Sequence, residues 1–115
     1  MKLLRIFLAL VITILLCAKS YAHPPSVIKI QFDPATQILK AVIEHQVSNP
    51  KTHYIGKVDI GLNGKEVQTL TFTSQKDRAS QLVEIKMNGV KSGDILSVEG
   101  YCNLSGKLVE EIKVS

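Results

Sequence analysis

The sequence predicts an all-β protein, a seven-stranded immunoglobulin-like sandwich. Short stretches of alternating apolar and polar residues recur along the chain after residue 22, and turn-forming residues separate them at short intervals. No stretch in this part keeps a helical period over three turns. Frequent strand and turn signals of this kind are typical of two antiparallel sheets packed face to face. A small barrel is the alternative architecture.

The first three strand candidates each put apolar residues on one face. The stretch VIKIQF does so with Ile28, Ile30 and Phe32, and DPAT then forms a turn in which Pro34 fixes φ. In ILKAVIEHQV the shared face holds Leu39, Ala41, Ile43, His45 and Val47. In YIGKVDIGL it holds Tyr54, Val58, Ile60 and Leu62.

Four further candidates complete the count. Asn63-Gly64 is a strong hairpin signal, and KEVQTLTFT follows it with Leu70 and Phe72 on one face. The stretch SQLVEIKM is the fifth candidate. The sixth, DILSVEGYC, has an apolar face formed by Leu96, Val98 and Cys102. A turn at Ser105-Gly106 leads to KLVEEIKV, the last candidate.

Residues 1–22 have the layout of a secretory signal peptide. Lys2 and Arg5 precede an apolar run, and Ser20-Tyr21-Ala22 offers small residues at positions −3 and −1 of a cleavage site. The run is short for a membrane span, which needs about 20 apolar residues. Leu16 before Cys17 is too large for a lipid-attachment site. We therefore expect cleavage after Ala22, a periplasmic or secreted protein, and no membrane association after cleavage.

The remaining residues, 23–115, are expected to form one domain. The predicted cleavage removes three basic residues, so 11 basic residues face ten acidic ones. This near-neutral charge and the few aromatic residues argue against nucleic-acid binding. Cys102 is then the single cysteine, which leaves a free thiol, an intermolecular crosslink or a metal ligand as its role.

Four side chains are candidate metal ligands, and each has a structural alternative. His45 on an apolar face is either a hydrogen-bonded core histidine or a ligand. His53 follows a turn and either faces solvent or folds back toward His45. Cys102 is either a small buried apolar residue or a soft thiolate ligand for iron, copper or zinc. His23 would become the N-terminus, either frayed or offering an amine and an imidazole to copper.

Two of these stretches resemble a known family. NPKTHYIGKVDIGLNG, followed much later by YCNLSGK, is similar to the superoxide reductase, or desulfoferrodoxin, iron-binding domain. This resemblance implies an immunoglobulin-like sandwich. It also implies that His53 matches a histidine ligand, that Cys102 and Asn103 match a CN pair with a cysteine ligand, and that Gly106 matches a glycine.

The ligand set departs from the family pattern. Ser105 stands where the last histidine belongs, and Val47 where another belongs, although His45 lies two residues earlier on the same face. His23 loosely matches an N-terminal histidine. The family site takes four imidazoles and one thiolate, whereas this chain has three histidines. A site of three histidines and one cysteine still suits iron, zinc or copper by ligand type.

The expected function is therefore that of an exported non-haem iron protein resembling superoxide reductase. Its metal ligands would be His53, Cys102, His45 and His23, and its partners a metal ion and superoxide or a small redox partner. If there is an enzymatic activity, the resemblance implies one-electron reduction of superoxide. The alternative is a metal-free periplasmic binding or carrier module that kept the sandwich. Exposed edge strands could also pair two copies into a dimer.

Overall fold

The computed structural model describes residues 22–115. The predicted signal peptide therefore lies outside the described residues, apart from Ala22. Within the described part, no helix is long and apolar enough to cross a membrane.

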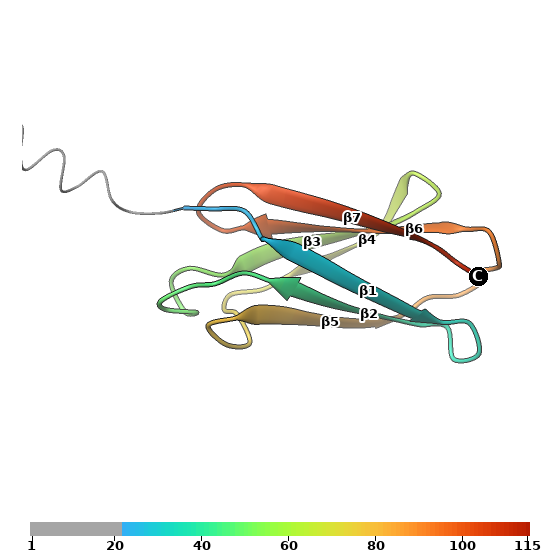
Figure 1. Cartoon of the computed structure of the whole chain (residues 1–115), viewed down its shortest axis with the longest axis horizontal. Helices are drawn as coiled ribbons and strands as arrows, with labels where there is room; N and C mark the ends of the chain where they lie inside the picture. Colours follow the sequence, from blue (N-terminus) through green and yellow to red (C-terminus); the bar gives the residue numbers. More distant parts are fainter. Residues whose placement is uncertain (1–21) are drawn as a thin grey trace, which may run out of the picture.

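Within residues 22–115 the predicted all-β architecture is confirmed, with seven strands and turns between them (Figure 1). Their bounds are β1 Val27–Asp33, β2 Ile38–Glu44, β3 Ile55–Leu62, β4 Lys65–Thr71, β5 Ser80–Lys86, β6 Ile95–Cys102 and β7 Lys107–Lys113.

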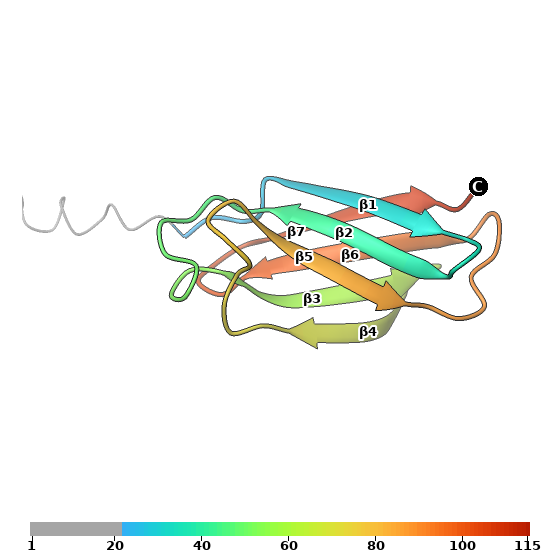
Figure 2. The same cartoon turned by 90° about the horizontal axis from the view of Figure 1, so that it is seen from below.

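The strands form two antiparallel sheets rather than a closed barrel. One sheet has the order β1-β2-β5 and the other has the order β4-β3-β6-β7. Figure 2 shows the two sheets lying over each other. This is an immunoglobulin-like sandwich in which β4 extends the sheet of β3, β6 and β7.

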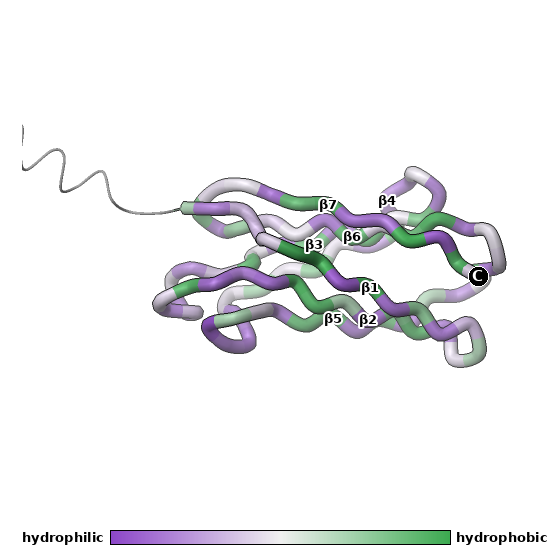
Figure 3. Tube along the Cα trace, viewed as in Figure 1, coloured by the Kyte–Doolittle hydropathy of each residue, from purple (hydrophilic) through white to green (hydrophobic). Residues whose placement is uncertain are grey.

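The core lies between the sheets because residues of β2, β5 and β6 alternate between buried and less buried positions. Figure 3 shows how hydrophobic and hydrophilic residues are distributed along the strands. Its fully buried members include Leu39, Ile43, Ile55, Val58, Ile60, Leu96 and Val98. The third strand differs from the expected alternation. The register shifts between Ile55 and Lys57, so Ile55 is fully buried and Tyr54, expected on the inner face, is only half-buried.

The hairpin signal between β3 and β4 is confirmed by backbone geometry. Asn63 and Gly64 have φ values of 51° and 83°. Positive φ at both central residues is the mark of the two-residue turn that matches the twist of antiparallel strands.

Strand direction and register bring four chain segments to one end of the sandwich. Val27 at the start of β1 pairs with Glu44 at the end of β2. Ile55 at the start of β3 pairs with Cys102 at the end of β6. Residues just before β1, just after β2 and just before β3 therefore meet near the end of β6. Three of the predicted ligands lie in these segments and the fourth ends β6.

The fully buried position of Leu39 predicts a large cost for its truncation. Leu39→Ala should lower the free energy of unfolding by about 2–5 kcal/mol, because it removes buried apolar surface and leaves a cavity. Urea unfolding followed by circular dichroism measures the change. Val67→Ala, at a position 49% exposed on β4, is the control and should change the free energy of unfolding little. Equal effects of the two substitutions would contradict this description of the core.

Candidate metal site

His45 continues the inward face of β2 beyond the last residue of the strand. Its backbone N–H donates to the carbonyl of Ala79 at 2.9 Å, and the Val47 N–H donates to the carbonyl of Arg78 at 2.8 Å. These bonds keep the segment extended beside the connection to β5. His45 is consequently fully buried, with 0% exposure of its surface.

His53 is held by a short loop that is tied to the end of β6. Its backbone N–H donates to the Asn49 carbonyl at 2.9 Å. The side chain of Asn103 accepts from the Tyr54 N–H at 2.8 Å and donates to the Thr52 carbonyl at 3.1 Å. Asn103, which directly follows Cys102, therefore fixes the loop on both sides of His53.

His23 is positioned by the two prolines that follow it. Gly106 has a φ of 89°, and a Cβ there would lie 2.9 Å from the Pro24 nitrogen. Pro25 is buried, and a Cβ at Gly100 would lie 3.5 Å from its ring. The two glycines thus let the N-terminal segment pack closely against the sheet, which sets His23 beside the ends of β2 and β6.

The three imidazoles form one cluster. Ring centroids lie 4.7 Å apart for His23 and His45, 5.0 Å for His23 and His53, and 4.8 Å for His45 and His53. One ring nitrogen from each lies within 4.8 Å of the other two. Cys102, a buried free cysteine, places its Sγ 3.2 Å from His53 Nε2. The structure thus brings all four candidate residues together, while their role as ligands stays a prediction.

The cluster is close to the size of a metal shell. Bonds of about 2.0–2.3 Å from zinc to nitrogen or sulfur put the donors of a tetrahedral site roughly 3.3–3.8 Å apart. The His53–Cys102 contact is already at this separation. The histidine nitrogens, within 4.8 Å of one another, need a contraction of about 1.5 Å at most. The three histidines can therefore hold a metal ion, whose identity their geometry does not set.

Both ring nitrogens of His45 and of His23 lie at hydrogen-bond distance from oxygen atoms. The two ring nitrogens of His45 lie 2.9 Å from Gln75 Oε1 and 3.1 Å from the His23 carbonyl oxygen. Those of His23 lie 3.0 Å from the Pro24 carbonyl and 2.9 Å from the Gln46 carbonyl. A neutral imidazole donates through one nitrogen only. In each of these two rings, both nitrogens therefore face oxygen acceptors, of which a neutral ring can donate to one.

The surroundings of His53 favour its neutral form. Burial lowers the pKa of His53, and the neighbouring rings of His45 and His23 lower that pKa further. A neutral imidazole has a free lone pair, which is the form that binds metals.

A cavity of about 480 Å³ opens to solvent beside the cluster. Its lining residues are His23, Gln46, Val47, Ser48, His53 and Arg78. Arg78 is exposed and, within residues 22–115, no carboxylate forms an ion pair with it. Two of the three imidazoles are thus accessible from a space with a guanidinium at its wall.

Gln75 is a residue of the site that sequence reasoning missed. It lies in the polar stretch between β4 and β5 and is 4% exposed. Its side-chain oxygen contacts His45 Nδ1 at 2.9 Å. A glutamine in a polar loop has no spacing or periodicity that marks it as buried, so the pattern of residues held no signal for it.

Comparisons with known protein families, with curated proteins and with solved structures found no match to this chain.

The lowered pKa of His53 predicts a pH dependence of stability in the metal-free protein. The unfolded chain, with a histidine pKa of about 6.5, binds a proton more readily than the folded chain. The contribution of His53 is therefore fully present above about pH 6.5 and is lost as the pH falls toward the lower folded-state pKa. Urea unfolding with chelator present, at about pH 7.5 and about pH 5.5, should show a smaller loss for His53→Gln than for the wild type. An equal loss in both proteins would contradict the assignment.

Proposed function

We propose that this protein binds a transition metal ion through His23, His45 and His53, with Cys102 as a fourth donor. The observation that carries the proposal is the approach of three imidazole nitrogens to within 4.8 Å of one another. These residues come from three segments that are separate in sequence and meet at one end of the sandwich. A site assembled in this way needs the folded protein, as metal sites generally do.

The surroundings of the cluster support a cation rather than a packed apolar contact. Three imidazoles lie ring to ring, and His45 is fully buried. Among the described residues, no carboxylate oxygen lies within 4.0 Å of a nitrogen of these rings. The ring nitrogens therefore have no carboxylate counter-charge, and a metal ion bound by them would replace some of their contacts with carbonyl oxygens.

The donor types limit the choice of metal. Imidazole with thiolate suits iron, copper and zinc, and does not suit magnesium or calcium, which prefer oxygen. The resemblance to superoxide reductase makes iron the first choice. Iron held by His23, His45, His53 and Cys102 would supply one-electron redox chemistry, such as the reduction of superoxide to hydrogen peroxide with an external electron donor. The residues of the chain would bind the ion and keep a path open to it.

The cavity beside His23 and His53 is that path. A small anion reaching the cluster passes Arg78, whose positive charge raises the local concentration of anions. Superoxide is such an anion, so the cavity supports the proposed substrate class. Action in the periplasm or outside the cell belongs to the same proposal and depends on cleavage after Ala22.

Metal titration tests the site directly. Wild-type protein beginning at His23 should bind one cobalt or zinc ion per chain. His53→Gln and His23→Gln should each weaken metal binding by at least about 100-fold. Loss of a residue that only hydrogen-bonds a metal ligand already lowers metal affinity by about 10–100-fold. Chelator competition measures the affinities. Asp33→Asn is the control, because β1 carries Asp33 away from the cluster. Absence of binding to the wild type would refute the metal site and favour a metal-free module.

Cys102 requires its own test because its contact with His53 fits two roles. A coordinated thiolate gives cobalt-loaded protein a sulfur-to-metal charge-transfer band in the near ultraviolet. A thiol that only hydrogen-bonds His53 gives none. We expect the band in the wild type and its loss in Cys102→Ser. This variant should still bind cobalt, but more weakly than the wild type does. A wild-type spectrum without the band would show that Cys102 is not a ligand.

Arg78 should influence anions that bind at the cluster. Azide titrated into cobalt-loaded protein should bind more weakly to Arg78→Gln, by about 3–10-fold at low salt, because one screened charge near the path is lost. Arg78→Lys keeps the charge and should bind azide nearly as the wild type does. The difference should shrink at high salt. Equal azide affinity in all three proteins would remove Arg78 from the proposal.

A further inference from the structure

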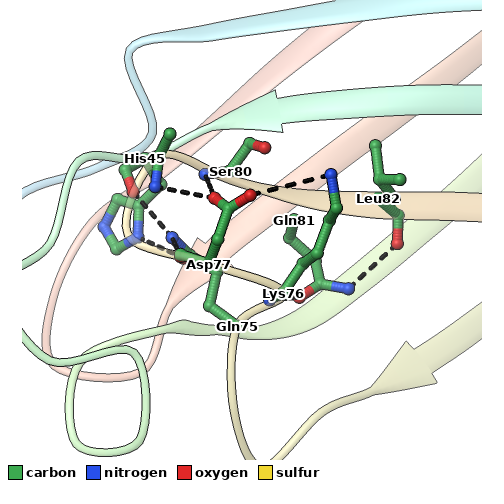
Figure 4. Close-up of polar contacts among 8 residues, drawn as sticks. His45, Gln75, Lys76, Asp77, Ser80, Gln81 and Leu82 are labelled. Atoms are coloured by element: carbon green, nitrogen blue, oxygen red, sulfur yellow. Dashed lines mark hydrogen bonds and ion pairs between the residues drawn. The ribbon is translucent and has the colours of Figure 1, made fainter.

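We infer that Gln75 is a positioning residue that holds the His45 imidazole with its proton on Nδ1 and directs Nε2 to the metal. The inference rests on the proposed metal site. Gln75 reaches His45 from the connection between β4 and β5, and its side chain lies among the polar contacts drawn in Figure 4.

The contacts of Gln75 fix the orientation of its amide. Its Nε2 donates to the His45 carbonyl at 2.7 Å and to the Asp77 carbonyl at 2.9 Å. Its Oε1 accepts from the Ile55 N–H at 3.2 Å. A carbonyl oxygen only accepts and a backbone N–H only donates, so the opposite amide orientation would put like groups against each other in all three contacts.

This orientation favours one tautomer of His45. Gln75 Oε1 lies 2.9 Å from His45 Nδ1 in a buried contact, and the competing acceptor, the His23 carbonyl, lies 3.1 Å from Nε2 in a less buried one. Both oxygens can only accept, and the shorter, buried contact assigns the proton to Nδ1. The lone pair of the neutral ring is then on Nε2, the nitrogen on the side of His23. Metal-binding histidines commonly donate their second ring N–H to a fixed acceptor, which sets both tautomer and ring orientation. Gln75 supplies that acceptor here.

The same glutamine holds His45 at two points, the ring and the backbone carbonyl, and links it to the loop of His53. Because Gln75 binds both the ring and the carbonyl of His45, the ring cannot rotate without breaking a buried hydrogen bond. The backbone N–H of Gln75 also donates to the Pro50 carbonyl at 2.9 Å. Pro50 lies in the loop that leads to His53, and Ile55 begins the strand that follows it. Gln75 therefore sets two of the ligand-bearing segments relative to each other.

Two substitutions separate the acceptor from the rest of the side chain. Gln75→Met keeps the length but removes both acceptor and donor. Gln75→Glu keeps an acceptor for His45 and Ile55 but loses the donor. Gln81→Met is the matched control. Gln81 is also a buried glutamine, 7% exposed, and bonds the Lys76 N–H and Leu82 carbonyl without touching a histidine.

Zinc affinity, measured by chelator competition on each folded protein, is the first readout. Gln75→Met should lose about 10–100-fold in affinity, the range typical of partners that orient metal ligands. Gln75→Glu should bind at least as tightly as the wild type, although it unfolds at lower urea. Gln81→Met should bind like the wild type. A purely structural role would instead make zinc affinity follow the loss of stability, with Gln75→Glu weakened together with Gln75→Met.

Nitrogen NMR of the histidine rings is the second readout and needs no metal. At alkaline pH, wild type and Gln75→Glu should show His45 with its proton on Nδ1, and Gln75→Met should show a mixture of tautomers. A proton on Nε2 in the wild type would overturn the inference, as would unchanged zinc affinity in Gln75→Met. Absence of zinc binding to the wild type would instead refute the metal site itself. If Gln75→Met does not fold, a tenfold loss of zinc affinity in Gln75→Glu overturns the inference.

Discussion

The antiparallel pairing of β3 with β6 is the constraint on which the histidine cluster depends. It sets Ile55 opposite Cys102, so His53, two positions before Ile55, reaches the Cys102 thiol. The register shift after Ile55 accompanies the full burial of the Ile55 side chain. Asn103 then bonds the loop backbone at Thr52 and Tyr54. Without this pairing, His53 would be an ordinary turn residue on a mobile connection.

The cluster joins parts of the chain that the sheets alone do not connect. His23 precedes β1 and belongs to no strand, whereas His45 and His53 flank a connection between the two sheets. A metal ion held by all three would close a loop from the N-terminal segment to the start of β3 and would stabilise the folded state by its binding free energy. In a small domain with no disulfide among its described residues, such a link would take the place that a covalent bridge has in many small exported domains.

Most strands could be predicted from alternation because one face lies against the core. β4 is the exception, with six of its seven residues exposed. His45 could be placed inward for the same reason, since it keeps the phase of Leu39 and Ile43. Tyr54 was placed wrongly because a bulge inserts a residue and reverses the phase, which no local pattern announces. The approach of His23 depends on the contact of Pro24 with Gly106 across more than 80 residues of sequence. Gln75 was missed because its burial comes from a loop that folds over the end of the sandwich.

The role of Cys102 decides what kind of centre four such donors make. Three imidazoles and a thiolate fill a tetrahedral shell, and a filled shell of this kind is typical of structural zinc. Three imidazoles alone leave a position free for a water molecule or a small anion, as in catalytic sites. Iron can accept further ligands beyond four donors, so a thiolate and an open position can coexist on it. The separation of 3.2 Å between Cys102 Sγ and His53 Nε2 fits a shared ion and also fits a direct hydrogen bond. The cavity that opens to solvent at His23 and His53 fits a centre with an open position better than a closed zinc site.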